Sequence, residues 1–248
     1  MKKYILLLIT VVVFSACVEE DSSSDEIEIE IMEEDCIVGD PCDDGNNLTI
    51  NDVYNSDCEC IGEEILVVEY GEFTDSRDGQ NYPTVIIGDQ EWLAKNLNYK
   101  FQPNIPVYWN CSPFCSEYGP LYHFYGIDQA IPPGWHLPTL EEWQVLFNNL
   151  GGPVVAGGKL KEGGVEHWND PNVGATNESG FTALPGGQMV EQNGFIFIGF
   201  KGYFWTSTQD PYPGSSNRYM ITIDSSFPGT QVHSNAVHKA CSVRLVKD

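Results

Sequence analysis

The first sixteen residues constrain this chain most, because they predict export and so decide which cross-links the fold can contain. Lys2 and Lys3 form a positive start, residues 5–14 are almost entirely apolar, and Ser15 and Ala16 are small. These are the parts of a secretory signal peptide, here at residues 1–16. The apolar run is shorter than the ~20 residues that cross a bilayer, so a retained membrane helix is the weaker interpretation.

Residues 14–17, Phe-Ser-Ala-Cys, resemble the lipobox of bacterial lipoproteins. The resemblance implies cleavage before Cys17 and a lipid on this cysteine; an ordinary signal peptide with an incidental cysteine is the alternative. Residues 17–35 hold ten acidic residues and no basic one, which predicts a disordered tether. Glu-Glu-Asp at 19–21 resembles the surface-export signal of Bacteroidetes lipoproteins. We therefore expect an outer-membrane lipoprotein, exposed on the cell surface and bound to the membrane through its lipid.

The charge of the chain limits its partners. It has 36 acidic residues against 12 Lys and Arg, a formal net charge of −24. Such a charge opposes binding to phosphate backbones, so we expect no nucleic-acid partner. The same charge favours solubility and attracts divalent cations.

Seven of the eight cysteines remain once Cys17 is assigned to the anchor, and an oxidising compartment favours disulfides. Four of them lie close together: Cys36, Cys42, Cys58 and Cys60. The last two are too near in sequence to bond to each other readily, which leaves 36–58 with 42–60, or 36–60 with 42–58. A zinc site is the rival interpretation. Cys111 and Cys115 form a further candidate pair, which would leave Cys241 free.

Composition and patterning predict the fold class. Residues 36–62 form a small cysteine-rich module, and residues 64–248 have the length of one domain with a single core. Frequent Gly and Pro with scattered aromatic residues indicate short strands and long loops. Strands are expected at 65–69, 84–87, 195–198, 203–207, 219–223 and 242–246. We expect an α+β fold with short antiparallel strands, two helices and long loops, preceded by the disulfide-rich module.

One helix has a clear start signal. Thr139 and Glu142 have the spacing of a capping box, Trp143 and Phe147 continue the helical period, and Gly151 follows as a stop. A second, weaker helix is expected over residues 121–130.

Several ordered strings resemble the Fibrobacter succinogenes major paralogous domain over residues 72–248. They include Trp-Leu-Ala-x-Asn-Leu at 92–97, Gly-Trp-His-Leu-Pro-Thr at 134–139, Gly-Lys-Leu-Lys at 158–161, Gly-Phe-x-Ala-Leu-Pro-Gly-Gly at 180–187, Trp-Thr-Ser-Thr at 205–208 and Ser-Val-Arg at 242–244. The resemblance implies a C-type-lectin-like fold in an exported bacterial protein, with no activity generally assigned to the family.

This chain departs from the family at two positions. Family members commonly have a cysteine before the Gly-Trp-His string and another in the last strand. Here those places hold residues 131–133 (Ile-Pro-Pro) and Leu245, so we expect ordinary packing in place of that disulfide. The cysteine-rich module itself resembles a short repeat of secreted bacterial proteins, often found beside adhesive domains.

Oxygen-bearing side chains crowd the cysteine-rich module. Asp43, Asp44, Asn46 and Asp52 surround Gly45, which is the kind of loop that calcium favours. The alternative is a disulfide-held turn whose side chains satisfy backbone amides.

Residues 168–170 repeat the Trp-Asn-Asp tripeptide that helps to bind calcium and sugar in C-type lectins. Trp168 would then stack on a sugar, and Asn169 and Asp170 would hold the ion; a polar surface loop is the alternative. A cation held by Asp170 with Asn172, Asn177 and Glu178 is a further possibility.

Aromatic side chains are the other candidates for a ligand-binding face, because rings stack on sugars while their polar ends stay wet. Tyr108 and Trp109 lead this group, and four more tyrosines belong to it: Tyr118, Tyr122, Tyr125 and Tyr212. About half of the group is expected to be core. Three tryptophans are expected to lie in the core: Trp135, Trp143 and Trp205.

The sequence lacks the motifs of common catalytic sites, such as Gly-x-Ser-x-Gly or His-Glu-x-x-His. The lone His136 is best interpreted as structural. The enzyme that converts cysteine to formylglycine has a related fold, and its chemistry needs a reactive cysteine pair. No matching motif surrounds Cys241 or the Cys111 and Cys115 pair. The sequence therefore predicts a non-enzymatic binding or adhesive protein for an extracellular glycan or surface protein. A structural envelope lipoprotein and, last, a glycan-active enzyme are the alternatives.

Overall fold

The computed structural model describes residues 36–99, 107–108, 115–190 and 194–248. No helix in these segments is both long and apolar enough to cross a membrane.

Some predictions fall on parts of the chain outside these segments. The signal peptide, Cys17 and the tether are among them, and so are Trp109 and Cys111. For Tyr108 and Cys115 the backbone alone is described. These predictions are neither confirmed nor contradicted.

The described chain forms two compact units. The smaller comprises residues 36–44 with Asp52–Ile61, and the larger comprises Gly45–Asn51 with Gly62–Asp248.

The cysteine-rich module is a cross-linked hairpin. Strand β1 (Thr49–Tyr54) pairs with β2 (Cys60–Glu64) in a two-stranded sheet. Disulfides join Cys36 to Cys58 and Cys42 to Cys60, with Cα atoms 5.7 and 6.0 Å apart. This is one of the two pairings that the sequence left open, and it confirms the disulfide-rich module.

One five-stranded sheet of the larger unit contains the edge strand β3. Its order is β3 (Glu69–Thr74), β4 (Asn81–Ile87), β5 (Gln90–Leu93), β15 (Val246–Lys247) and β8 (Trp135–His136), with every neighbouring pair antiparallel. The strand predicted at 84–87 is confirmed inside β4.

The strand predicted at 65–69 is wrong, because β3 begins only at Glu69. Residues 65–68 belong to no strand although their apolar side chains alternate. Leu66 and Val68 pack against the core, whereas Ile65 and Val67 are exposed. The alternation therefore comes from an extended segment that lies on the core without a paired neighbour.

Two further antiparallel sheets complete this unit. The first has the order β10 (Gly194–Ile196), β9 (Gln188–Val190), β14 (Ala240–Cys241), β7 (Leu121–His123) and β6 (Val107–Tyr108). The second has the order β11 (Lys201–Gln209), β12 (Arg218–Asp224) and β13 (Thr230–Asn235). The predictions at 203–207 and 219–223 are confirmed inside β11 and β12, and the one at 195–198 only in part.

Helix α3 (Leu140–Asn149) begins as its sequence predicts. The Thr139 hydroxyl accepts the Glu142 N–H at 3.1 Å, and the Glu142 carboxylate accepts the Thr139 N–H at 2.7 Å. The helix stops before Gly151, which adopts φ +88°. A local signal of this kind decides the helix start because both bonds close within one turn.

The second predicted helix, at 121–130, is mostly wrong. The segment begins as strand β7, passes through the 3₁₀ turn η1 (Phe124–Gly126) and is α-helical only in α2 (Ile127–Ala130). Tyr122 is fully buried and pairs with Cys241 of β14. Strand pairing in the core thus overrides a weak helical pattern. The two remaining short helices are α1 (Cys115–Tyr118) and α4 (Ala156–Leu160).

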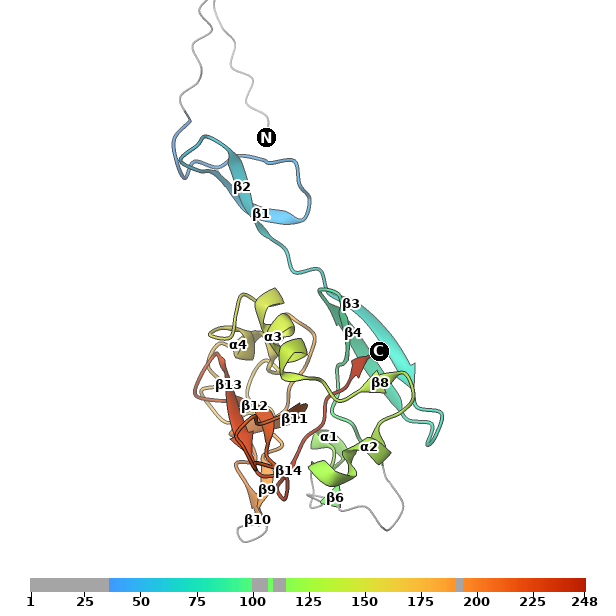
Figure 1. The fold of residues 1–248 in the computed structure, drawn as a ribbon. Coiled ribbons are helices and arrows are strands. Elements are labelled where there is room, and N and C mark those ends of the chain that lie inside the picture. Colours follow the sequence, from blue (N-terminus) through green and yellow to red (C-terminus); the bar gives the residue numbers. More distant parts are fainter. Residues whose placement is uncertain (1–35, 100–106, 109–114, 191–193) are drawn as a thin grey trace, which may run out of the picture. The chain divides into compact units, whose positions relative to one another are not determined.

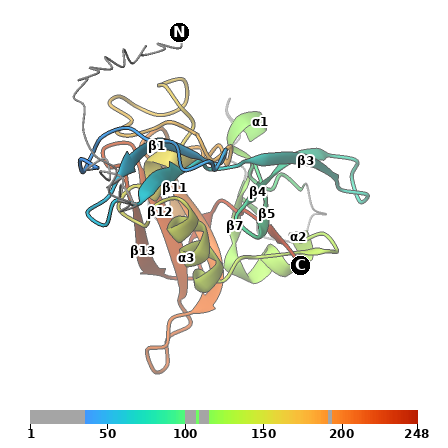
Figure 2. The ribbon, with the colours of Figure 1, turned by 90° about the horizontal axis from the view of Figure 1, so that it is seen from above.

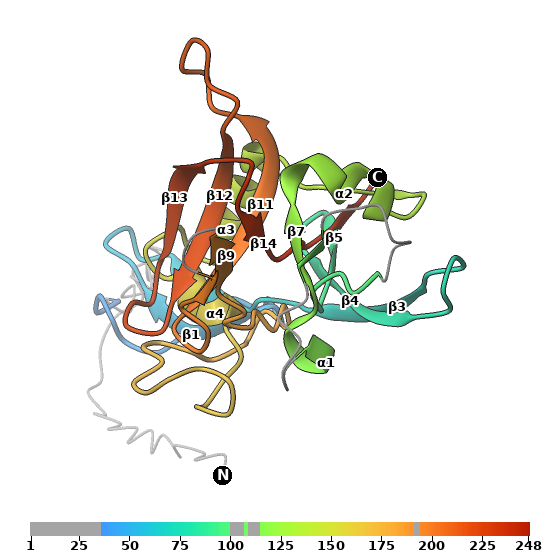
Figure 3. The same ribbon diagram turned by 90° about the horizontal axis from the view of Figure 1, so that it is seen from below.

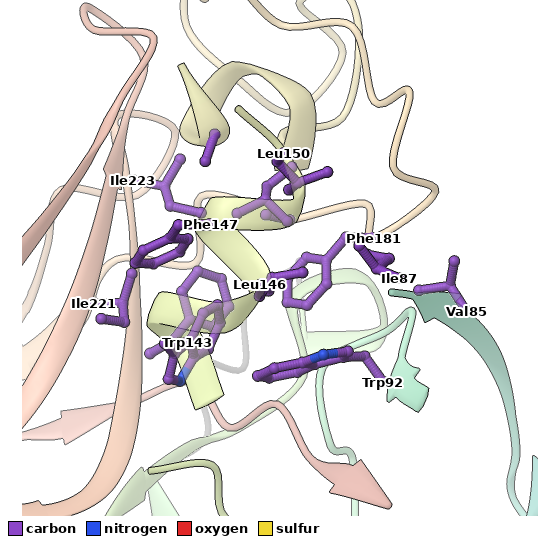
Figure 4. Close-up of a cluster of buried hydrophobic side chains, with 14 of the residues drawn as sticks. Val85, Ile87, Trp92, Trp143, Leu146, Phe147, Leu150, Phe181, Ile221 and Ile223 are labelled. Atoms are coloured by element: carbon purple, nitrogen blue, oxygen red, sulfur yellow. The ribbon is translucent and has the colours of Figure 1, made fainter. Parts of the chain in front are cut away.

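Helix α3 lies beside the β11–β12–β13 sheet in Figure 2, and the main core packs around this helix, as Figure 4 shows. Trp143 and Phe147 of α3 pack with Ile221 and Ile223 of β12 on one side and with Trp92 of β5 on the other. The rings of Trp92 and Trp143 lie 4.8 Å apart between centroids. Burying large rings in this way supplies most of the stabilisation.

Arg244 is fully buried, and its hydrogen-bond partners among the described residues include no carboxylate. Its Nε donates to Asn96 Oδ1 at 2.7 Å, and its Nη atoms donate to the carbonyls of Leu93 (2.8 Å), Phe181 (2.6 Å) and Thr182 (2.6 Å). Burial lowers the pKa of Arg244 to about 9, so the guanidinium remains charged at neutral pH. The Arg244 side chain therefore connects three segments that are far apart in the sequence: residues 93–96, residues 181–182 and its own segment.

The strand predicted at 242–246 is wrong, because residues 243–245 belong to no strand. Ser242 makes only an isolated bridge to Phe204, and Val243, Arg244 and Leu245 are all buried in succession. The segment runs through the interior between β14 and β15, where the Val243 and Leu245 carbonyls accept the Leu97 and Leu93 N–H groups. In Figure 1 it is the red segment that leads to the C-terminus.

Apolar side chains pack at the two places where the resemblance implies a disulfide in other members, as expected. Leu245 is fully buried in a second core cluster, and Ile131 packs against the same cluster. Trp135 and Trp205 belong to this cluster too, and with Trp143 they confirm the predicted core tryptophans. The described fold consists mainly of small antiparallel sheets with few helices; the lectin-like arrangement stays a prediction.

Candidate ligand-binding groove

A groove of about 450 Å³ opens between η1–α2 and the loop that joins β11 to β12. That loop projects beyond its sheet in Figure 3. The residues that line the groove are Phe124, Tyr125, Asp128, Gln209, Gly214, Ser215, Ser216, Arg218 and Val237.

The β11–β12 loop is held by its own polar groups. The Asp210 carboxylate accepts the Tyr212 N–H at 3.0 Å and also accepts the Ser234 hydroxyl of β13. These two hydrogen bonds lower the pKa of Asp210. Gln209 Nε2 donates to the Ser215 carbonyl at 2.8 Å across the loop. The loop therefore has a defined shape although it is exposed.

Arg218 forms part of the floor of the groove. Its guanidinium carbon lies 4.6 Å from the centre of the Phe124 ring, and Nη1 reaches the Ser216 and Asn217 carbonyls at 3.4 and 3.3 Å. Nε is buried with no hydrogen-bond partner among the described residues. A buried N–H without a partner is uncommon, so the hydrogen bonds of this guanidinium are incomplete among the described residues.

Two exposed tyrosines stand at this site. Tyr125 is 70% exposed on the wall of the groove, and Tyr212 is 73% exposed on the loop. Both were predicted as members of a binding face, and their exposure agrees with that. Tyr118 and Tyr122, predicted in the same group, are 6% and 0% exposed and belong to the interior.

Trp168 is not a ligand-binding residue, because its side chain is only 1% exposed. The indole N–H donates to the Ala183 carbonyl at 2.9 Å inside the core. Asn169 and Asp170 remain on the surface without the tryptophan beside them as a stacking platform. The match to the lectin tripeptide thus does not carry a sugar site here.

The wider cation set around Asp170 stays a prediction. Asn172 is buried and donates to the Glu162 and Gly164 carbonyls. Asn177 bonds to Thr182, and Glu178 pairs with Lys159 at 2.9 Å. Three of the four side chains therefore have partners among the described residues, although Asn172 Oδ1 itself is buried without one.

The module's calcium candidates are partly brought together. Asp43, Asp44 and Asp52 each offer a carboxylate oxygen, all within 4.8 Å of one another. Asp52 Oδ2 accepts the Asp44 N–H at 3.3 Å, while Asp52 Oδ1 is buried without a hydrogen-bond partner. Asn46 Oδ1 instead accepts the Leu48 N–H at 3.0 Å, as the disulfide-held turn predicts. Calcium at the three carboxylates stays a prediction.

The remaining reactive side chains have structural surroundings. His136 bonds through Nε2 to Glu142 and through Nδ1 to Asp248, each at 2.8 Å. Burial disfavours its charge, but these two carboxylates raise the pKa of His136 overall. Cys241 is the free cysteine of the described segments; it is fully buried, and burial raises the pKa of its thiol far above the usual range. A thiol of this kind is a poor nucleophile.

The sequence interpretation missed the polar side of the groove. Asp128, Gln209, Ser215 and Arg218 carry no motif, and they meet only because η1–α2 packs beside a hairpin loop from a distant part of the chain. A signal was present: Tyr212 lies between two prolines, in a run of Gly and Ser that follows a strand. An aromatic residue at the tip of a stiff turn is typical of a contact residue.

Comparison with known proteins adds one finding. A family model described as the Fibrobacter succinogenes major domain matches residues 85–247. No curated protein and no solved structure matches the chain.

Proposed function

Because the chain belongs to the Fibrobacter succinogenes major domain family, which does not by itself fix a ligand, we propose its function from the groove. We propose that the domain is a non-enzymatic glycan-binding module. The N-terminal lipid anchor and acidic tether would display it outside the cell.

The observation that carries the proposal is the exposed Tyr125 ring beside a groove of hydrogen-bonding side chains. A sugar presents an apolar C–H face and a rim of hydroxyls, so it needs one stacking ring and several nearby donors and acceptors. Gln209, Ser215 and Arg218 provide both kinds of group at the same groove. The lining has one acidic and one basic side chain, which suits a neutral sugar.

Binding is favoured over hydrolysis by the acidic residues of the groove. Glycoside hydrolysis uses two carboxyl groups about 5–9.5 Å apart across the substrate. Of the described residues that line this groove, only Asp128 carries a carboxylate. We therefore propose recognition without bond cleavage.

The test is glycan-array binding by the oxidised chain from residue 36 onward, in calcium and again in excess chelator. We expect a neutral glycan to bind in both buffers, because the groove does not need an ion. Absence of binding to any glycan at near-millimolar protein would overturn the proposal.

A matched pair of variants locates the site. Tyr125→Ala should weaken binding about tenfold or more, equivalent to about 1.4 kcal/mol of lost stacking. Tyr70→Ala is the control, because Tyr70 is also 70% exposed but lies on β3 away from the groove lining. Equal losses in the two variants would count against this groove.

A further inference from the structure

The loop from Lys161 to Asn172 presents a second, independent cluster of side chains. Its inner residues are firmly anchored. Lys161 Nζ donates to the carbonyls of Val173 (2.8 Å), Asp224 (3.0 Å) and Phe227 (3.2 Å), and the Trp168 indole is buried. The backbone next to these two anchors, which carries Glu162 and His167, is therefore held in place by the fold.

Glu162, Glu166 and His167 converge on one point. Each offers one ligand atom, and these atoms all lie within 4.8 Å of one another. His167 Nδ1 lies 2.8 Å from Glu162 Oε2 and 2.9 Å from Oε1. Two atoms that bind the same metal ion at about 2.0–2.2 Å lie at most about 4.4 Å apart, so small side-chain movements are enough to bring the three ligand atoms onto one ion.

The other nitrogen of the same imidazole faces a carboxylate of its own. His167 Nε2 lies 3.5 Å from Glu117 Oε2 of α1. A histidine that binds a metal through one nitrogen commonly donates its other N–H to a carboxylate, which fixes the tautomer and the ring orientation. The edge of the Tyr118 ring contacts the imidazole at 5.6 Å between centroids and restricts it further.

The charge of the cluster also calls for a cation. Glu162, Glu166 and Glu117 surround a single imidazole, which offers one positive charge at most. The nearest basic residue in sequence, Lys161, directs its ammonium to backbone carbonyls instead. If His167 only formed ion pairs with Glu162 and Glu117, these two carboxylates would be explained. The position of Glu166 would not be explained.

We propose that Glu162, Glu166 and His167 bind one zinc ion, with Glu117 as the residue that positions the imidazole. The ligand set indicates the metal: an imidazole nitrogen with carboxylate oxygens suits zinc, whereas calcium takes oxygen ligands alone. Three protein ligands leave a fourth position for water. The site is separate from the groove, so it stands or falls independently of glycan binding.

The experiment is calorimetric titration of the purified, oxidised, metal-free mature chain with zinc chloride. We expect saturable binding of one zinc ion that depends on His167. His167→Gln should weaken it at least tenfold, and Glu117→Gln by about ten- to a hundredfold, since loss of an orienting carboxylate has effects of that size. His238→Gln is the control, because this exposed histidine lies outside the cluster, and it should bind zinc like the wild type.

Two further arms keep the proposal open to refutation. The Asp44→Asn variant should retain the His167-dependent site, which separates it from the module's carboxylates. Glu166→Gln changes an exposed residue and serves if His167→Gln fails to fold. No zinc binding at about 100 µM, or the same affinity in the His167→Gln and wild-type chains, would overturn the proposal.

Discussion

The cysteine-rich module and the larger domain achieve order by different means. In the module, Ile37 and Val38 are each 64% exposed and Ile61 is 50% exposed, while two disulfides close its loops. In the larger domain, four tryptophans are almost fully buried, and buried cations join distant segments. The comparison shows that a short segment relies on covalent bonds where it has too little apolar surface to bury.

Reduction of the disulfides should produce the largest difference between the module and the larger domain. A disulfide that closes a loop of about 20 residues contributes roughly 3 kcal/mol, so losing both removes most of what orders the module. Hydrogen exchange under reducing conditions should show amides of residues 36–61 losing protection while those of β11 and β12 keep theirs. Unchanged protection in the module would mean that its apolar contacts suffice.

Removal of the buried guanidinium should have the largest effect within the domain. Arg244→Met leaves Asn96 Oδ1 and the three backbone carbonyls buried without their donor. We expect a loss of about 3–5 kcal/mol of unfolding free energy and a fall in Tm on the order of 10 °C. The control Lys247→Met removes an exposed cation paired with Glu91 and should stay within about 0.5 kcal/mol. Similar Tm values for both variants would contradict the role of Arg244.

The smallest expected effect concerns pH. Burial opposes the charge of His136, but Glu142 and Asp248 raise its folded pKa above the ordinary value. The protonated form is therefore favoured in the folded state. Its contribution is complete below about pH 6.5 and is lost as pH rises through the folded pKa. Because the side chain is 36% exposed, solvent screening keeps the contribution below about 1 kcal/mol.

Urea unfolding of the wild type and of His136→Gln at pH 5.5 and 7.5 measures this effect. The wild type should exceed the variant by more at pH 5.5 than at pH 7.5. A difference that grows toward pH 7.5 would show that the neutral imidazole is the stabilising form.

Features that close within a few residues could be predicted from the sequence. The Thr139 capping box and the strands β4, β11 and β12 are of this kind, and so is the limited choice of disulfide pairings in the module. Each depends on neighbours along the chain or on a short run of aromatic and β-branched residues between turn residues. Local chemistry is therefore enough to predict these features without knowledge of the tertiary contacts.

Features that depend on distant segments could not be predicted. The sequence pattern predicts a strand around Arg244. Its guanidinium, however, binds backbone carbonyls that are 62 to 151 residues away in the sequence. Trp168 matched a known tripeptide, but a tripeptide does not determine which side of a loop faces the core. The groove likewise joins elements far apart in the chain, and the His167 loop meets Glu117 of α1 only through the fold.

The burial of Arg244 and Lys161 also affects what neighbouring molecules encounter. Two of the chain's 12 basic residues point inward, so the outer surface is more negative than the composition indicates. At physiological ionic strength such a surface repels like charge over about 8 Å. Copies crowded together would keep their distance, anionic polymers would be held off, and uncharged molecules could still approach the tyrosines freely.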